Sequence, residues 1–473
     1  MNPLQDLLAV GPVAIVTLAS LLLLTVEAFK DRSEGLTSGI AMVGLVAAGV
    51  AGLASVGSSG TAFQGMVTTG GFAGFCAAVF ALGALLSVML SRSYIGKEGI
   101  EHGEYYALLL FAVVGMMLMA AAADLVVLFI GLELMSISFY ALAGFARRRP
   151  TSNEAALKYF LLGAFSTGFL LYGIALVYGA TGTTSITGIT GRAGELAGEP
   201  MLLIGLGLLL IGLAFKIAAV PFHMWVPDVY EGAPTTVTAF MSTAGKAAAF
   251  ASILLVFTPF LLKSVEPLRA IIAFVAACSM VVGNVIAIAQ SSVKRMLAYS
   301  SIAHAGYILA GVVAANSMGS NGVLFYLVAY TVMNVGAFGV LSVFESTDGG
   351  TVAYDDYAGL SSRRPFMAAL MALFMFSLAG IPPFAGFFGK YYVFAGAIEG
   401  GYTWLAILGV LMSVVSAYYY LRLVVLMYFK EQVSADHARP AGLAVTALAV
   451  AALALLQFGI FPSTILDLTA RLF

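Results

Sequence analysis

The sequence predicts an all-α polytopic membrane protein with about 14 transmembrane helices. Two observations support this fold class: 61% of the 473 residues are hydrophobic and only 10% are charged. Soluble domains usually contain about 25% charged residues, so this composition does not suit a protein surrounded by water. The net charge of -1 and the lack of a long basic run argue against a nucleic-acid partner.

Apolar runs of about 20 residues recur along the chain, and each could cross a hydrocarbon core of about 30 Å as one helix. The first run precedes its basic flank, which indicates a membrane helix and not a signal peptide. Only the region of Asp124 separates the fourth run from the fifth. We expect spans at residues 7–29, 36–57, 71–91, 104–122, 124–145, 154–179, 200–222, 234–261, 267–289, 295–315, 321–345, 365–396, 402–428 and 440–462.

The distribution of lysine and arginine between the connections predicts an orientation. Connections on one side hold 13 basic residues and those on the other side hold 4. Because basic connections stay in the cytoplasm, and an even number of spans returns the chain to its starting side, we expect both termini on the outer side. The 13 are Lys30, Arg32, Arg92, Lys97, Arg147, Arg148, Arg149, Lys294, Arg295, Arg363, Arg364, Lys430 and Arg439, and the 4 are Arg192, Lys263, Arg269 and Arg471.

Three lysines lie deep inside expected spans. Lys216 and Lys246 are too far from the span ends to reach water easily, and Lys390 lies about 25 residues into its span. A lysine at the centre of a membrane helix costs roughly 2.5–3.5 kcal/mol, and such residues often mark ion or proton pathways. Glu133 is the only acid expected at mid-membrane, so a structural salt bridge would neutralise one lysine of the three. The pattern favours a proton pathway.

Four other ionisable residues have two readings each. Lys158 and Arg422 lie near the cytoplasmic ends of their spans, where a long side chain can reach the interface as an anchor. We favour the anchor for Arg422 and leave Lys158 between anchor and relay. His223 could take up protons or be an interfacial residue, and His304 could be a relay or a helix-packing histidine.

Prolines interrupt two of the expected helices: Pro221 in KIAAVPFHMW, and Pro382 and Pro383 in LAGIPPFAGFFGK. Proline removes a backbone donor, and non-helical backbone is tolerated at membrane depth only inside protein or beside water. Broken helices at related positions of two halves are typical of transport sites, whereas the alternative is a packing kink. We expect a three-helix segment at 1–103, inverted repeats at 104–261 and 262–430, and a C-terminal helix at 431–473.

Motifs for nucleotides and metals are absent from the sequence. No GxGxxG opens a βαβ unit, and there is no GxxxxGK[ST], CxxC or HExxH, which are the usual signatures of such sites. Cys76 and Cys278 lie in apolar runs and are too few to hold an iron–sulfur cluster. We therefore expect no cofactor or metal on this chain, and an energy source that lies in partner proteins.

Buried lysines suit proton transfer because a low dielectric can bring their protonation equilibrium close to physiological pH. A charge that moves by a few ångströms then loads or unloads the amine. The expected positions are Lys158, Lys216 or His223 for proton uptake, Lys246 at the centre and Lys390 for release. We also expect Glu133 to pair with Lys216.

Five stretches of the sequence resemble one family of membrane proteins. They are GLELMSISFYALAGF, EAALKYFLLGAFSTGFLLYGIALVYG, FKIAAVPFHMWVPDVYEGAPTTVTAF, SSVKRMLAYSSIAHAGYILAG and LAGIPPFAGFFGKYYVF. From about Glu104 to Lys430 the chain is similar to the antiporter-like subunits of the proton-pumping NADH-quinone oxidoreductase, respiratory complex I. Its DVYEGAP element looks more like the subunit N family than like the paralogous L and M families.

The resemblance implies a non-redox membrane-arm subunit of a proton-translocating enzyme, with two inverted five-helix repeats and discontinuous helices 7 and 12. It implies relay roles for Glu133, Lys158, Lys216, Lys246 and Lys390, with His304 and, less securely, Lys294 in the tenth helix. FMN, iron–sulfur clusters and quinone are expected in partner subunits, which include paralogous antiporter-like subunits. The implied location is the bacterial plasma membrane, in contact with its lipids.

Three other functions fit parts of the sequence. A subunit of a multisubunit sodium/proton antiporter would share the buried lysines but use a sodium gradient. A passive scaffold would be more stable without intramembrane charges. A stand-alone solute carrier would need a polar pocket for a metabolite, and the sequence gives no sign of one.

Overall fold

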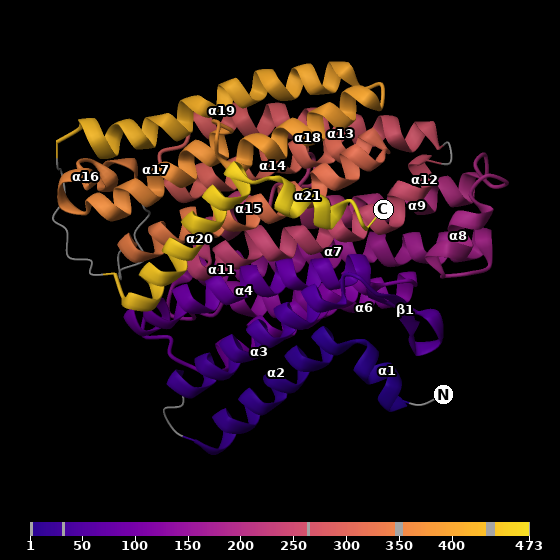
Figure 1. Ribbon diagram of the computed structural model, residues 1–473, viewed down its shortest axis with the longest axis horizontal. Coiled ribbons are helices and arrows are strands. Elements are labelled where there is room, and N and C mark those ends of the chain that lie inside the picture. Colours follow the sequence, from indigo (N-terminus) through magenta and orange to yellow (C-terminus); the bar gives the residue numbers. More distant parts are fainter. Residues whose placement is uncertain (1–2, 31–33, 263–264, 346–352, 432–439, 473) are drawn as a thin grey trace.

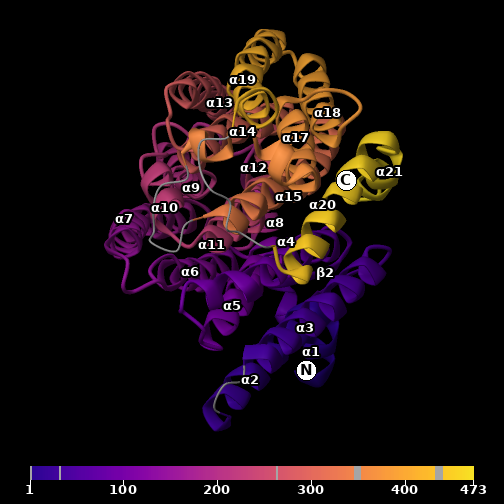
Figure 2. The ribbon, with the colours of Figure 1, turned by 90° about the vertical axis from the view of Figure 1, so that its left-hand side faces the viewer.

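The computed structural model describes residues 3–30, 34–262, 265–345, 353–431 and 440–472. In these residues the chain forms a bundle of long helices packed side by side (Figure 1). Two early helices, α2 (Gly11–Phe29) and α3 (Glu34–Ser55), lie at one edge of the bundle, and α19 (Thr403–Phe429) lies at the opposite edge (Figures 1 and 2). Arg32, Lys263 and Arg439, which the charge count includes, lie outside the described residues.

Thirteen helical segments of the described chain are long and apolar enough to cross a membrane, and they match thirteen of the fourteen expected spans. Besides α2, α3 and α19, these are α4 (Gly71–Lys97), α5 (Glu104–Ala121), α6 (Leu125–Ala143), α7 (Pro150–Thr181), α9 (Pro200–Ile217), α11 to α12 (Thr235–Phe240 and Lys246–Leu262), α13 (Glu266–Ile288), α14 (Val293–Ala314), α15 (Ser317–Phe344) and α20 (Gly442–Ile460). The short helices are α1 (Pro3–Ala9), α8 (Ile186–Arg192), α10 (Val226–Gly232), α16 (Leu360–Arg363), α21 (Ser463–Thr469) and the 3-10 turns Phe63–Gly65 and Tyr354–Tyr357.

The predicted division at Asp124 is confirmed. Asp124 is the N-cap residue of α6, and its Oδ1 accepts a hydrogen bond of 2.8 Å from the backbone N–H of Val126. Its Oδ2 accepts a second bond, of 2.6 Å, from the hydroxyl of Thr184. An N-cap carboxylate satisfies backbone donors that a helix start leaves unpaired. α5 and α6 are therefore two separate helices.

The twelfth expected span consists of two shorter helices, α17 (Pro365–Ala379) and α18 (Ala385–Glu399). α17 ends four residues before Pro383, and α9 ends at Ile217, four residues before Pro221. A proline ring obstructs the carbonyl group four residues before it, which explains both end points. The seventh span is therefore shorter than the expected 200–222. The residues after the two helix ends, Ala218 and Gly380, both have left-handed φ values, 63° and 86°.

The eighth expected span contains a π-helical turn. This turn, Met241–Gly245, joins α11 to α12. A π-helical turn accommodates one more residue than an α-helical turn, and such turns are frequent at functional sites. Lys246 is the first residue after it.

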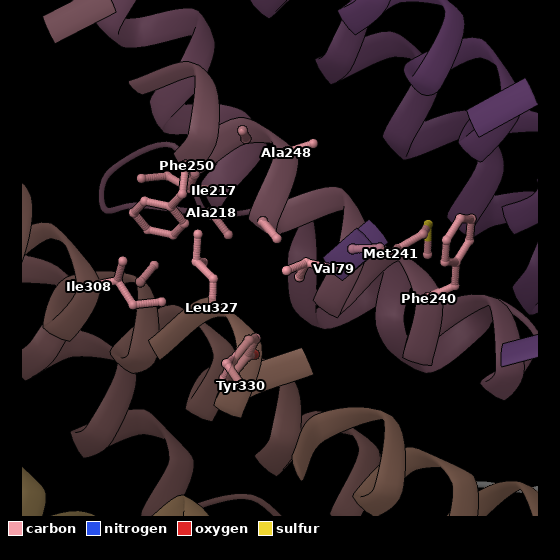
Figure 3. Close-up of a cluster of buried hydrophobic side chains, with 14 of the residues drawn as sticks. Val79, Ile217, Ala218, Phe240, Met241, Ala248, Phe250, Ile308, Leu327 and Tyr330 are labelled. Atoms are coloured by element: carbon pink, nitrogen blue, oxygen red, sulfur yellow. The ribbon is translucent and has the colours of Figure 1, made fainter. Parts of the chain in front are cut away.

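The centre of the bundle is formed by α11 to α12, α14 and α15. In their apolar windows 94%, 94% and 89% of residues are buried, against 22% for α2 and 28% for α19. Figure 3 shows part of this core, where Phe250 of α12 lies near Ile217 and Ala218 at the end of α9. Ile308 of α14 and Leu327 of α15 belong to the same cluster (Figure 3). Any charged group on these three helices is therefore far from solvent unless a cavity reaches it.

The short helices between the spans have no counterpart in the sequence prediction, and neither does a β-hairpin. The antiparallel strands β1 (Ser59–Ala62) and β2 (Val67–Gly70) form a hairpin between α3 and α4, with Ser59 opposite Gly70 and Ala62 opposite Val67. The hairpin is short and rich in Gly, Ser and Thr, so hydropathy gave it no signal.

Candidate functional site

Lys246 lies in the centre of the bundle with 1% of its surface exposed. Its ammonium nitrogen, Nζ, donates hydrogen bonds to the backbone oxygen and the hydroxyl of Ser301, at 2.6 and 2.5 Å. It also lies 6.0 Å from the centre of the Tyr330 ring. Among the described residues, no carboxylate forms an ion pair with Lys246. The amine is therefore held by neutral acceptors.

His304 continues the polar groups along α14. Its Nδ1 lies 2.7 Å from the hydroxyl of Tyr326, and its Nε2 lies 3.1 Å from the hydroxyl of Tyr420. Tyr420 is also hydrogen-bonded to Ser300, which is adjacent to the Ser301 that holds Lys246. Hydroxyl and imidazole groups can both donate and accept hydrogen bonds. The described core therefore contains a polar file from Ser300 to Tyr326, which begins one residue before the partner of Lys246.

Lys390 lies on α18 beside the break in the twelfth span. Its Nζ donates to the backbone oxygens of Leu378 and Ala379, at 3.2 and 3.0 Å, and to the hydroxyl of Ser413, at 2.6 Å. The two carbonyl groups belong to the C-terminal end of α17, where the helix dipole favours a cation. An apolar cavity of about 500 Å³ between α18 and α19 borders Lys390 and Ser413.

Lys216 does not form the ion pair with Glu133 that the sequence suggested. Its Nζ donates a hydrogen bond of 3.2 Å to the hydroxyl of Tyr140. The same nitrogen lies 5.4 Å from the centre of the Tyr140 ring and 5.8 Å from the centre of the Tyr159 ring. Tyr140 lies seven residues after Glu133 on α6, so the two share one face of that helix. The Oε1 atom of Glu133 is buried and has no hydrogen-bond partner among the described residues. Tyr140 thus takes the position next to Lys216 that was expected for Glu133.

Lys158 belongs to a charged cluster at one end of the bundle. It pairs with Glu154 at 2.6 Å and with Asp228 of α10 at 2.7 Å. Arg295 pairs with Asp228 at 3.0 Å and with Glu231 at 2.9 Å. Partial burial raises the pKa of Asp228, but the hydrogen bonds from Lys158 and Arg295 outweigh it and lower that pKa below its usual value. Asp228 and Glu231 were not identified from the sequence.

Lys294 is buried, although the charge count placed it in a connection. It has 2% of its surface exposed, and its Nζ lies 3.3 Å from Oε1 of Glu345 and 3.3 Å from the backbone oxygen of Ala233. Glu345 is 3% exposed and also accepts a hydrogen bond of 2.5 Å from the Thr235 hydroxyl. Glu345 was not identified from the sequence, although an acid that ends a long apolar run was a visible signal.

His223 lies between α9 and α10 and is partly buried. Burial lowers its pKa, and a hydrogen bond with the Pro221 backbone opposes that effect. Its Nδ1 has no partner among the described residues, so no described contact links His223 to the lysines.

Arg422 stacks on Tyr354 at 4.3 Å and donates to the Gln290 backbone at 3.5 Å, which agrees with an anchor.

Within the described part of the chain, no three histidine, cysteine, aspartate or glutamate side chains are grouped so as to hold a metal ion. The candidate site thus consists of buried amines, one imidazole and hydroxyl groups in a multi-pass helical bundle. These groups can bind, hold and pass protons.

A bundle of this kind defines an antiporter-like membrane subunit, and residues 122–416 match the family model described as "NADH:quinone oxidoreductase/Mrp antiporter, TM". A curated relative from Trichlorobacter lovleyi, NADH-quinone oxidoreductase subunit N, is 49% identical over 471 residues, which are 98% of this chain and 96% of the relative. The chain therefore belongs to the NADH-quinone oxidoreductase subunit N family.

Two solved structures show the same fold. A chain of respiratory complex I from Thermus thermophilus with bound Aureothin matches with a TM-score of 0.85 and 37% identity, over 97% of this chain and 99% of that one. A chain of the Mrp complex from Dietzia sp. DQ12-45-1b matches with a TM-score of 0.87 and 22% identity, over 98% of this chain and 97% of that one.

Proposed function

We propose that this chain is a membrane-arm subunit of respiratory complex I that translocates protons, driven by NADH-to-quinone electron transfer in other subunits. The observation that supports this function best is the setting of Lys246 and Lys390: both are at least 95% buried and are held by hydroxyl and carbonyl oxygens. A buried charge without a counter-ion is strongly destabilising, so stability does not explain these two amines. Amines that lose and regain a proton need no fixed counter-ion.

The relay residues are Glu133, Lys158, Lys216, Lys246 and Lys390, with His304 as a further member. Protons enter near Lys158, Lys216 or His223, pass to Lys246 and leave by Lys390. The polar file along α14 supports the step from Lys246 toward His304. Because Glu133 does not form an ion pair with Lys216, its influence on that amine is electrostatic and acts at a distance.

The proposal includes two inverted repeats, 104–261 and 262–430, between the segments 1–103 and 431–473, with both termini on the outer side of the bacterial plasma membrane. The helices α9 and α17 support the relation between the two repeats. Each ends four residues before a proline, and the residue that follows each helix has a left-handed backbone conformation. FMN, iron–sulfur clusters and quinone belong to partner subunits in this proposal. The partners are the other membrane-arm subunits, including antiporter-like paralogues, and membrane lipids.

A sodium/proton antiporter remains the alternative function. It has weaker support, because the Mrp chain shares the fold at only 22% identity, whereas the subunit N relative is 49% identical.

The test is Lys246→Met in the assembled complex, reconstituted into proteoliposomes. Proton uptake and NADH-quinone turnover are measured together, and Lys430→Met serves as a control because Lys430 is exposed at the end of α19. We expect Lys246→Met to lower proton uptake by about 100-fold, the usual effect of losing a proton-transfer group, and the control to behave as wild type. Wild-type uptake per electron in an assembled Lys246→Met complex would overturn the proposal.

A further inference from the structure

A charged cavity of about 320 Å³ opens between the start of α7, α10, the start of α14 and the end of α15. Charged side chains make up most of its lining: Arg149, Glu154, Asp228, Glu231, Lys294, Arg295 and Glu345. A polar space of this size holds several water molecules. The predicted orientation places the cavity on the cytoplasmic side.

The cavity ends at the ion pair between Lys294 and Glu345. Both side chains are almost fully buried, at 3% and 4% exposure, whereas Asp228 and Arg295 near the opening are 38% and 32% exposed. Burying an ion pair often contributes less to stability than well-packed apolar residues in the same place. A buried pair at the end of a charged cavity therefore suggests a role other than stability.

Several charged and titratable groups face Glu345 from the surrounding elements: Tyr94, Lys97 and Glu98 of α4 and its end, Arg149 before α7, Lys294 of α14, and Tyr357. Burial raises the pKa of Glu345, but Lys294, Thr235 and Arg149 together outweigh it and hold that pKa below its usual value. Glu345 is therefore a carboxylate at neutral pH, and it forms an ion pair with Lys294.

Helix α14 carries both Lys294 of this pair and a hydrogen-bond partner of Lys246. Lys294 and Ser301 lie seven residues apart on α14, which is two turns, about 10.5 Å, along one face of the helix. Ser301 accepts the hydrogen bond from Lys246 and also interacts with the side chain of Tyr230. Tyr230 belongs to α10, whose Asp228 and Glu231 line the cavity. α10 thus borders the cavity on one side and the partners of Lys246 on the other.

We propose that Lys294 and Glu345 form the proton-loading site of this subunit, which takes protons from the cavity and supplies Lys246 by way of Tyr230 and Ser301. Lys294 releases one proton toward Lys246 and regains one from cavity water, so the pair returns to its starting state after each transfer. Lys158 lies beside this cavity, because it pairs with Glu154 and Asp228, which line it. The inference rests on the proposed function and specifies where protons enter.

The deciding variant is Lys294→Arg in the intact complex. Arginine keeps the positive charge beside Glu345, but its guanidinium does not release its proton in proteins. A structural ion pair would tolerate this change, and a proton-loading site would not. We expect Lys294→Arg and Glu345→Gln to lower proton uptake in proteoliposomes by about tenfold or more, with normal amounts of assembled complex on a native gel.

Two further variants cover a failure to fold. The double variant Lys294→Met with Glu345→Gln removes both charges, so it leaves neither partner as an unpaired buried charge. We expect it to assemble even if a single variant does not, and its proton uptake to stay low. Glu199→Gln, an exposed acid outside the cavity, is the control. Wild-type uptake in Lys294→Arg, or recovered uptake in the double variant, would overturn the loading site. If Lys246→Met still abolishes uptake in that case, the proposed function stands and only the loading site fails.

Discussion

Gly386 controls how closely α18 packs against the end of α17. A Cβ atom built at this position would lie 1.9 Å from the backbone oxygen of Ser377. Ordinary van der Waals contact begins at 3.4 Å, so Gly386→Ala forces the two backbones apart by about 1.5 Å, a kind of overpacking that usually costs 1–3 kcal/mol. The hydrogen bond from the Gly386 N–H to the Ser377 hydroxyl, 3.1 Å long, would be lost as well.

The same displacement acts on Lys390, one helical turn after Gly386. Its bonds to the carbonyl oxygens of Leu378 and Ala379 are 3.2 and 3.0 Å long, and a shift of about 1.5 Å takes both beyond hydrogen-bonding distance. A hydrogen bond to a charged group contributes about 1.5–3 kcal/mol, and 1.4 kcal/mol corresponds to a factor of ten in rate. We therefore expect Gly386→Ala to slow proton uptake by about tenfold or more.

The assay compares proton uptake and thermal unfolding of complexes that contain Gly386→Ala or Gly168→Ala. Gly168 lies in α7, and nothing is within 4 Å of a Cβ atom built there. Its replacement should leave uptake unchanged and favour the helix by about 1 kcal/mol or less. Equal uptake in the two variants would refute the argument that the closeness of α17 and α18 positions Lys390.

Three other predictions concern single side chains. Burial lowers the pKa of His223, so below about pH 6.5 the unfolded chain binds a proton that the folded chain does not, and stability decreases as the pH decreases; His223→Gln should therefore reduce the loss of thermal stability below about pH 6.5. Arg422→Met should lower the unfolding temperature through the loss of about 0.5–1 kcal/mol of cation–π stacking on Tyr354, with proton uptake unchanged. Tyr420→Phe removes the hydroxyl between Ser300 and His304 and should slow uptake in the liposome assay without affecting assembly.

The spans could be predicted because their causes are local: apolar length sets the number of helices. The prolines marked where two spans are interrupted, but the expected bounds 200–222 and 365–396 ran past the observed ends of α9 and α17, four residues before Pro221 and Pro383. The deep lysines could be found for the same reason, since a charge inside an apolar run is visible in the sequence. The hairpin at Ser59–Gly70 was missed because two four-residue strands leave no hydropathy pattern.

The partners of the charges could not be predicted, because they depend on how distant helices pack. Glu345 and Lys294 lie 51 residues apart, and each stands near a span end where solvent was the simpler expectation. Lys216 was expected beside Glu133, the acid at mid-membrane, but α6 places Tyr140 next to the amine. Hydrogen-bond partners such as Ser301 and Ser413 are ordinary small polar residues, and nothing in the sequence distinguishes them from others.

The π-helical turn at Met241–Gly245 sets the rotational phase of a single membrane span. Each residue of an α-helix advances the side-chain direction by about 100°, so one extra residue turns everything after it by that angle. Before the turn, Thr235 faces Glu345; after it, Lys246 faces Ser301. If one residue of the turn were deleted and the helix became regular, these two contacts would be out of phase and only one of them could form. The irregular turn allows one helix to make both contacts, and thereby joins the proposed loading site to the central lysine.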